Sequence, residues 1–513
     1  MTAFMNVVSM KEVNNTHSRK HFLQITSAGL SYWLVGGFAL SASQLLQSCN
    51  KDSMMQGHDS GMMMGSPVLV TQGDFTTLLP QSQLYNSSQE LRPQNTTCMI
   101  NGQSIHVLGY FALSMLGPSF NFQQGDVISI PIVNDLLETT NIHWHGLHIA
   151  SNADGLPNDG ITAGASFIVS FQINQRASMC WYHPHIDGLT ASQVWRGLAG
   201  MFFIRDQEEA SLNLPSGEFE IPLVIQDRNL SSSVLNYAPS GMDKMFGLQG
   251  SHILINGVFS PYKEVSKSAY RLRVLNGSNS RIYNLAFDDN RSFLVIGNDG
   301  GLLPDSTYMN SFLLAPGERV DLIVDFSTSL LNSEIHLVSK TFSGAGNTQG
   351  AQEFQILKFI VSSDIEANNA VTSTTSNIDN LVFTGGLTRT FDISNQSMNM
   401  SMRHNINGIE YSPEVVNFSV QSGIVEKWVF DNSNGAESHP IHVHGTSFQI
   451  AERTSGRNSV MPFEMGWKDT VLILPGEVVS VLIQFSISNQ KYVLHCHNLE
   501  HEDNGMMLQF EVL

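Results

Sequence analysis

A short phrase that returns at a nearly constant interval is the feature that most constrains the fold of this chain. Ile-Asn-Gly begins at residues 100, 255 and 406, so successive copies lie 155 and 151 residues apart. Pro-Gly-Glu begins at residues 316 and 475, followed by RVDLIVDFS or VVSVLIQFS, and AGASFIVSFQI from residue 163 is a weaker copy. Three copies at one period predict three homologous domains.

The sequence within each copy predicts β-strands. Short runs such as VISIPIV, YRLRVL and VLIQF are rich in Val, Ile and Phe and are separated by Gly, Pro, Asn and Asp. This pattern is typical of antiparallel sandwiches and barrels, and amphipathic helices are scarce. A chain of 513 residues also exceeds what one hydrophobic core usually serves. We therefore predict an all-β protein with domains at residues 66–205, 206–369 and 370–513.

Charge and cysteine content exclude several classes of protein. The formal net charge is −19, which repels phosphate backbones and anionic lipid and favours cationic or neutral partners. We therefore expect no nucleic-acid partner. The four cysteines, Cys49, Cys98, Cys180 and Cys496, are too few and too scattered for a disulfide scaffold, although one bridge, Cys98 to Cys180, remains open.

Residues 1–48 have the features of an export signal. Arg19 and Lys20 precede a long apolar run that contains many small residues. A membrane anchor is the alternative, but Ser, Gln and Gly dilute the run, and no second apolar stretch of membrane-spanning length follows. We expect a soluble mature protein outside the cytoplasm, with residues 49–65 as a flexible lead rich in Met and His.

Two short stretches of this signal resemble bacterial address sequences. Residues 18–23 resemble a twin-arginine signal in which Lys20 replaces the second arginine, and residues 46–49 resemble a lipobox. We expect a periplasmic or otherwise exported protein and a monomer. A lipid anchor on Cys49 is the alternative to simple cleavage.

Ten of the 18 histidines fall in four compact clusters. They are His143 and His145 in NIHWHGLH, His183 and His185 in CWYHPH, His439, His442 and His444 in HPIHVHG, and His495, His497 and His501 in HCHNLEHE. In a strand the two histidines of an H-x-H point to the same face, with Cα atoms about 6.5 to 7 Å apart. The four H-x-H pairs supply eight imidazoles, which suits three closely spaced metal ions, whereas a mononuclear zinc site needs three or four ligands.

Cys496 lies between two of these histidines and therefore points to the opposite face of its strand. It belongs to a different metal. Its natural companions are His439, His501 and Met506, because two imidazoles, one thiolate and a weak axial thioether form a blue-copper electron-transfer centre. The covalent neighbours of Cys496 are ligands of the other cluster, so electrons have a through-bond route.

The motifs HWHG, WYHPH, HPIHVHG and HCHNLEHEDNGM resemble the four copper-binding signatures of the multicopper oxidases, the family of laccases, ferroxidases and bacterial copper-efflux oxidases. The resemblance covers residues 66–513 and implies three cupredoxin-like Greek-key β-sandwich domains. It implies four copper ions: type 1 at His439, Cys496, His501 and Met506; type 2 at His143 and His442; and a type 3 pair, one ion at His145, His183 and His497 and the other at His185, His444 and His495. The type 1 site falls in the third domain, and the other three ions lie between the first and third.

The chemistry that this resemblance implies is one-electron oxidation of a small reducing substrate at type 1 copper, transfer through Cys496, and four-electron reduction of O₂ to water. Asp154 and Glu502 stand where the family places acids that supply protons. Asp469 also has a family counterpart, and turn capping and tuning of the type 1 histidine are both open roles for it.

The reductant is less constrained, with Fe(II), Cu(I) and phenols all open. The stretch HEDNGMM resembles the copper-efflux oxidases, but residues 340–365 contain no methionine, and Glu437 stands where those enzymes have one. Glu437 and Asp503 together would form an anionic, oxygen-lined entrance near type 1 copper, which suits Fe(II) better than Cu(I).

Two groups of methionines offer other sites for Cu(I). The first is Met54, Met55, His58 and residues 62–64 in the lead, and the second is Met398, Met400, Met402 and His404, where burial in the core is the favoured interpretation.

Three other functions are alternatives to an oxidase. They are a non-catalytic periplasmic copper-binding or delivery protein, a scaffold that has lost catalysis, and a copper nitrite reductase. All the ligand positions are filled, which argues against a scaffold, and the threefold repeat and eight-histidine set argue against the reductase.

Overall fold

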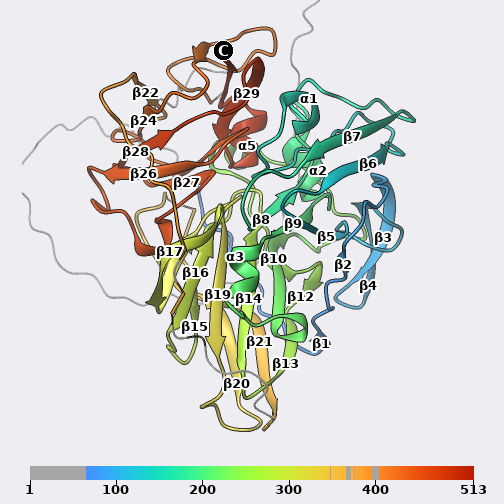
Figure 1. The fold of residues 1–513 in the computed structure, drawn as a ribbon. Helices are drawn as coiled ribbons and strands as arrows, with labels where there is room; N and C mark the ends of the chain where they lie inside the picture. The colour runs from blue at the N-terminus through green and yellow to red at the C-terminus, as the bar shows by residue number, and fades with distance from the viewer. Residues whose placement is uncertain (1–64, 347, 365–370, 372, 375, 395–403) are drawn as a thin grey trace, which may run out of the picture. The chain divides into compact units, whose positions relative to one another are not determined.

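A computed structural model describes residues 65–346, 348–364, 371, 373–374, 376–394 and 404–513 (Figure 1). Residues 63–513 form one compact unit. The described chain is built mainly of strands with a few short helices, so the all-β prediction is confirmed. The export signal, Cys49, the methionine-rich lead up to residue 64, and Met398, Met400 and Met402 lie outside the described residues. In the part that is described, no helix is long and apolar enough to cross a membrane.

The first segment contains one sheet and two hairpins. The sheet has the order β2 (Leu84–Tyr85), β5 (Ser119–Gln123), β9 (Gly200–Arg205) and β8 (Ser178–Tyr182). The hairpins are β3 (Gln94–Ile100) with β4 (Gln103–Gly109) and β6 (Val127–Val133) with β7 (Ser166–Gln172). In β6, Ile128, Ile130 and Ile132 are buried while the residues between them are not, as period-two alternation predicts. Two short helices, α1 (Ser151–Asp154) and α2 (Thr190–Trp195), carry the connections.

The middle segment contains two larger sheets. One has the order β12 (Val258–Phe259), β11 (His252–Ile255), β10 (Glu220–Arg228), β14 (Ala269–Asn276), β19 (Arg319–Asp325), β16 (Phe293–Asn298) and β17 (Gly301–Met309). The other has the order β1 (Thr77–Leu78), β13 (Pro261–Ser266), β21 (Phe354–Ser363), β20 (Glu334–Ser339), β15 (Tyr283–Phe287) and β18 (Ser311–Leu314). Helices α3 (Gln207–Ser211) and α4 (Gly241–Phe246) and the turn η1 (Gly217–Phe219) complete it. One core cluster contains residues of both sheets, such as Leu272 and Phe359.

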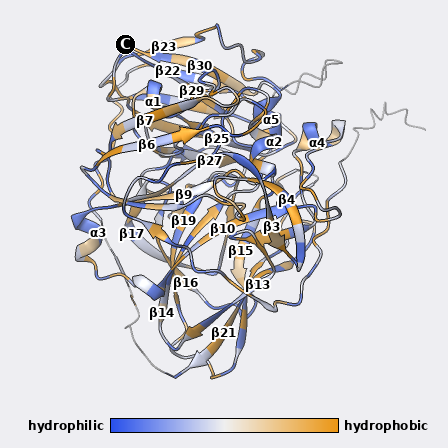
Figure 2. Ribbon diagram, turned by 90° about the vertical axis from the view of Figure 1, so that its right-hand side faces the viewer, coloured by the Kyte–Doolittle hydropathy of each residue, from blue (hydrophilic) through white to orange (hydrophobic). Residues whose placement is uncertain are grey.

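The third segment is also built on two sheets. The first has the order β22 (Thr388–Asp392), β24 (Glu426–Asp431), β28 (Val478–Ile483) and β26 (Phe448–Arg453). The second has the order β23 (Phe418–Val420), β30 (Met507–Val512), β29 (Gln490–Cys496), β25 (His439–Val443) and β27 (Thr470–Ile473). A 3₁₀ turn, η2 (Pro462–Glu464), lies between β26 and β27, and helix α5 (Leu499–Asp503) connects β29 to β30. Stretches of hydrophobic residues, coloured orange in Figure 2, lie along many of the strands.

The two repeated phrases of the sequence are turns in the structure. In each Ile-Asn-Gly copy both Asn and Gly have positive φ, from 50° to 57° at Asn and from 71° to 79° at Gly. Two positive φ values in succession define the two-residue hairpin turn that joins β3 to β4 and β11 to β12. Every sheet takes its strands from one predicted segment, except that β1 pairs with β13 of the middle segment. The domain boundaries stay predictions.

The disulfide that was left open between Cys98 and Cys180 is not formed. Both thiols are free, and each lies in a different core cluster, Cys98 with Val107 and Cys180 with Trp144. Packing in separate cores keeps the two sulfur atoms from bonding.

A buried cluster of charged side chains holds helix α3 against the strands of the middle segment. The Arg271 guanidinium donates through Nε and Nη2 to the Asp321 carboxylate, with the shortest contact at 2.5 Å, and through Nη2 to Glu209 Oε1 at 2.7 Å. Arg273 and Glu220 extend the cluster at 3.0 Å. A buried ion pair of this kind strongly destabilises the protein when only one partner is removed, because the other charge stays buried.

We expect Arg271→Met to lower the free energy of unfolding by about 3 to 5 kcal/mol, since it leaves Asp321 without its main partner. Denaturant unfolding of the copper-free protein measures this. Arg92→Met, which breaks an exposed ion pair with Glu90, is the control and should unfold like the wild type. Equal unfolding midpoints for all three proteins would contradict the prediction.

Candidate metal centres

The eight histidines of the H-x-H pairs lie at or just after the ends of β8, β25 and β29 and in the connection between β6 and α1. His183 and His185 follow β8, and His143 forms an isolated bridge with His183. In the third segment β25 pairs with β29, so that His442 lies opposite His495. Helix α2 packs on α5, and α1 lies beside β29 (Figure 1). The docking of these elements places the first-segment histidines against the third-segment ones.

The eight rings form one compact group from which water is excluded, since each is at most 1% exposed. Rings from the two segments stack in pairs: His145 on His442 with centroids 3.7 Å apart, and His143 on His444 at 3.8 Å. The Nε2 atom of His495 lies 3.2 Å from Nε2 of both His185 and His444. Three imidazole nitrogens that converge so closely are suited to bind one ion.

One nitrogen on several of these rings is held by the protein. Nδ1 of His143 donates to the carbonyl of Asp154 at 2.9 Å, Nδ1 of His442 to that of Asp469 at 2.8 Å, and Nδ1 of His183 to that of Pro184 at 2.8 Å. Such hydrogen bonds fix the tautomer of a metal-binding histidine.

The other nitrogen of each of these three rings, Nε2, is buried and finds no hydrogen-bond partner in the described residues. His145 is reversed: its Nε2 bonds Asp469 Oδ1 at 2.9 Å, and its Nδ1 has no partner in the same part of the chain. Leaving a buried polar atom unpaired costs about 1 to 3 kcal/mol, so a cluster of such atoms requires an explanation. Bound metal ions would pair with these nitrogens, so the residues present fit copper.

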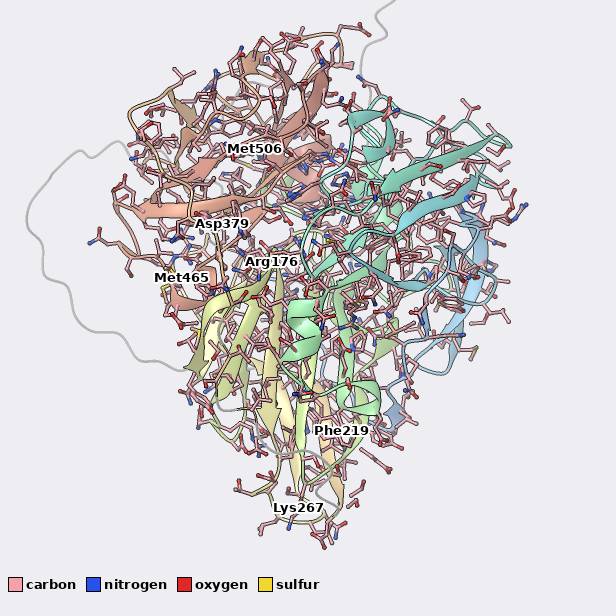
Figure 3. The ribbon with its side chains drawn as sticks, in the orientation of Figure 1. Arg176, Phe219, Lys267, Asp379, Met465 and Met506 are labelled. Atoms are coloured by element: carbon pink, nitrogen blue, oxygen red, sulfur yellow. The ribbon has the colours of Figure 1, made fainter. Side chains whose placement is uncertain are left out.

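A second group lies apart from these eight rings. Cys496 Sγ is 3.5 Å from Nδ1 of His439 and 3.6 Å from Nδ1 of His501. Met506 is buried in the same core cluster as Cys496 and lies among the strands of the third segment (Figure 3). The backbone N–H of Cys496 donates to the carbonyl of Met506 at 3.1 Å, so the two residues are tied together. The structure thus brings together all four residues predicted for type 1 copper.

Burial favours the neutral form of most of the clustered imidazoles. It lowers the pKa of His439 to about 3. It also lowers the pKa of His145, His183, His185, His444, His495, His497 and His501 well below the ordinary value. Neutral imidazoles are the metal-binding form. The pKa of the Cys496 thiol is raised by burial, so a metal ion must displace its proton.

The two predicted proton-supplying acids flank the histidine group from two sides. Asp154, which is fully buried in α1, places Oδ2 2.7 Å from Nδ1 of His444. Glu502 in α5 places Oε2 3.1 Å from Nδ1 of His495 and Oε1 3.6 Å from Nδ1 of His185. Burial raises the pKa of Glu502, so this carboxyl can hold a proton.

Asp469, for which turn capping and tuning of the type 1 histidine were both open, contacts two histidines of the eight-ring group. Its Oδ1 bonds His145 and its carbonyl bonds His442, as described above. Burial works to raise the pKa of Asp469, but the Arg319 guanidinium beside it holds that pKa well below its usual value.

The two acids predicted for a substrate entrance contact different parts of the chain. Asp503 accepts from the backbone N–H groups of Thr190 at 3.1 Å and Ala191 at 2.9 Å, so it caps the start of α2. Glu437 is only 3% exposed, and its carboxylate lies against Gly346. The role of this pair towards a substrate stays a prediction.

Two residues near the type 1 group were not singled out as site residues from the sequence. Glu500 is buried and accepts from Leu248 N at 2.9 Å and Asn279 Nδ2 at 2.8 Å, and burial raises its pKa to about 7. His404, read from the sequence as a core histidine, stacks on His501 with centroids 4.0 Å apart. Glu500 adjoins a ligand in HNLEHE and could have been noticed there, whereas the stacking of His404 has no local signal.

We expect His145→Ala to lower the copper content by at least one ion per chain, because it removes one of the converging ligand atoms. His148→Ala is the matched control from the same motif. His148 is not one of the eight histidines, and its Nε2 bonds Ser447 Oγ at 2.8 Å. Elemental analysis per chain measures the outcome. Equal copper loss in both variants would contradict the assignment.

Comparisons with known proteins identify the family. The family description "Multicopper oxidase" matches residues 93–209 and 386–513. The chain is 32% identical over 411 residues to "Multicopper oxidase mco" of Staphylococcus haemolyticus, covering 79% of this chain and 84% of that one. It is also 32% identical to "Laccase" of Bacillus subtilis, covering 73% and 80%.

Among solved structures, McoA multicopper oxidase from Aquifex aeolicus matches with a TM-score of 0.76 and 33% identity over 85% of this chain and 99% of that one. The predicted cupredoxin-like fold class is confirmed by such neighbours. A catalytically active oxidase is favoured over a copper-delivery protein, because the relatives are named as oxidases and the ligand positions are filled. The chain belongs to the multicopper oxidase family.

Proposed function

We propose that this oxidase binds four copper ions in the sets predicted from its motifs. His439, Cys496, His501 and Met506 hold one ion, and the eight paired histidines hold the other three. Bound copper supplies one-electron oxidation of a reducing substrate at the first set and four-electron reduction of O₂ to water at the second. The observation that carries this proposal is the set of buried imidazole nitrogens that face one another without hydrogen-bond partners among the described residues.

The residues around the two sets provide position and protons. Cys496 is bonded through the backbone to His495 and His497, so one tripeptide holds both sets at a fixed separation. Asp154 Oδ2 and Glu502 Oε2 each lie within 3.1 Å of an Nδ1 atom of the eight-ring group, which places both acids to pass protons to it. The complete burial of the rings excludes bulk water from the group.

Copper counting and spectroscopy test this proposal. We expect four coppers per chain, an intense blue absorption band and a near-ultraviolet shoulder. Cys496→Ser should lose the blue band but keep the near-ultraviolet shoulder and about three coppers, because the thiolate serves only the first set. Zinc in the purified protein, a single copper per chain, or a blue band in the Cys496→Ser variant would contradict the assignment.

We propose Fe(II) as the preferred reductant, with Cu(I) and phenols as the alternatives. Glu437 lies two residues before His439, and its hard oxygen atoms suit Fe(II) better than Cu(I). The contacts of Asp503 with α2 leave Glu437 as the acid on which this proposal mainly depends.

We expect Glu437→Gln to raise KM for Fe(II) about tenfold, the result of losing about 1.4 kcal/mol of contact with the cation. The KM of a neutral phenol should stay near the wild-type value, because its binding needs no anion. Steady-state kinetics with Fe(II), Cu(I) and a phenol measure the effect. An equal effect of Glu437→Gln on every substrate would refute the proposal.

We also propose that the protein is exported and monomeric. The charged, apolar and small-residue pattern of residues 1–48 supports export, and the sequence around Cys49 supports a lipid anchor as the alternative to cleavage.

A further inference from the structure

The middle segment supplies none of the proposed copper ligands, yet one of its turns lies against the eight-ring group. The turn spans residues 316–319 and connects β18 to β19. It contains the middle copy of the repeated Pro-Gly-Glu phrase and ends at Arg319, the first residue of β19. Two of its residues, Gly317 and Arg319, contact parts of the site directly.

Arg319 is buried and all three of its guanidinium nitrogens donate hydrogen bonds. Nη1 and Nη2 donate to the two carboxylate oxygens of Asp469 at 2.7 and 2.5 Å. Nε donates to the carbonyl of Met179 at 2.7 Å, and Nη2 also donates to the carbonyl of Asp299 at 3.1 Å. A two-point contact of this kind fixes the plane of the carboxylate. Arg319 is therefore held by all three predicted segments at once.

Asp469, held in place by Arg319, in turn bonds two rings of the eight-ring group. Its Oδ1 accepts from Nε2 of His145, and its carbonyl accepts from Nδ1 of His442. The first contact decides which nitrogen of His145 carries the proton, and it leaves Nδ1 with its lone pair towards the group. These two rings stack 3.7 Å apart, so a shift of the Asp469 carboxylate would move both.

Gly317 leaves room for a third ring. A Cβ atom at this position would lie 2.9 Å from Cδ2 and 3.1 Å from Nε2 of His497. The equivalent Gly476 has nearly the same backbone φ, +79° against +81° at Gly317, but a Cβ there would meet nothing within 4 Å. Gly164 in the weaker copy also faces open space. Only the middle copy of the repeat thus packs on a predicted ligand.

We propose that the turn of residues 316–319 positions the eight-ring group for O₂ reduction, with Arg319 acting through Asp469 on His145 and His442, and Gly317 acting on His497. Arg319 and Gly317 are positioning residues, since neither is a ligand. The proposal rests on the assignment of the eight histidines as copper ligands. It gives the middle segment a role in the site to which it contributes no ligand.

The first test compares Arg319→Met with Arg271→Met. Arg271 is also a buried arginine in an ion pair, but it contacts no predicted ligand. We expect Arg319→Met to bind the copper of the eight-ring group about tenfold to hundredfold more weakly and to alter its EPR and near-ultraviolet signals. The blue band should persist, because it reports the separate Cys496 set. Arg271→Met should unfold more easily yet keep wild-type copper content and spectra.

The second test stays informative if Arg319→Met fails to fold. Gly317→Ala and Gly476→Ala impose a similar backbone strain at nearly equal positive φ, but only the first places a methyl group against a histidine ring. We expect Gly317→Ala alone to change the EPR signal of the eight-ring group and its copper content. Arg319→Lys should retain part of the wild-type signal, because lysine keeps the charge but not the two-point contact.

The outcomes separate this inference from the proposed function. Wild-type protein that binds no copper at the eight histidines would refute the proposed function. Wild-type protein with full copper, together with unchanged copper binding and spectra in Arg319→Met or equal effects of the two glycine variants, would overturn the inference alone.

Discussion

The burial of eight imidazoles in one group is the constraint on which the rest of this structure depends. A polar ring that leaves water must satisfy both nitrogens, or the fold loses free energy. In this protein one nitrogen of most rings is held by a carbonyl or a carboxylate, and the other faces its neighbours. Bound copper would pair with the ring nitrogens that have no hydrogen-bond partner among the described residues. The packing of the rings therefore depends on metal binding.

Close approach of so many rings also requires that they be neutral. Charged imidazoles stacked 3.7 Å apart would repel each other, and burial lowers the pKa of one of the stacked rings, His145, well below its ordinary value. Two acids beside the group differ in the charge state that their surroundings favour. Asp469 is held as an anion by Arg319, whereas Glu502 lies where burial favours its protonated form. The same low-dielectric interior thus keeps one carboxylate fixed as a hydrogen-bond acceptor and another ready to hold a proton.

Contacts between segments distant in sequence hold the two copper sets in place. Arg319 contacts Asp469 across 150 residues, and Glu500 accepts from Leu248 across 252 residues. Asp503 caps α2 of the first segment, while its neighbours His501 and Glu502 lie beside Cys496 and His495. Helix α5 is therefore a junction in which consecutive residues meet different partners, because a helix turns successive side chains in different directions.

The sequence by itself determined which residues gather and how they divide. Alternation in HCH separates Cys496 from its neighbours, the strand pattern predicts an all-β fold, and the repeat marks turns that the structure places in all three copies. Each of these follows from local periodicity, which depends on backbone geometry alone.

Only the tertiary structure decided the partners of those residues. The contacts of Asp469 with His145, of Gly317 with His497 and of Asp503 with α2 join stretches more than 150 residues apart, and no local pattern encodes them. The free state of Cys98 and Cys180 follows in the same way from the cores in which they pack. Periodicity fixes the face on which a side chain lies, but what that face meets depends on how whole sheets and helices dock.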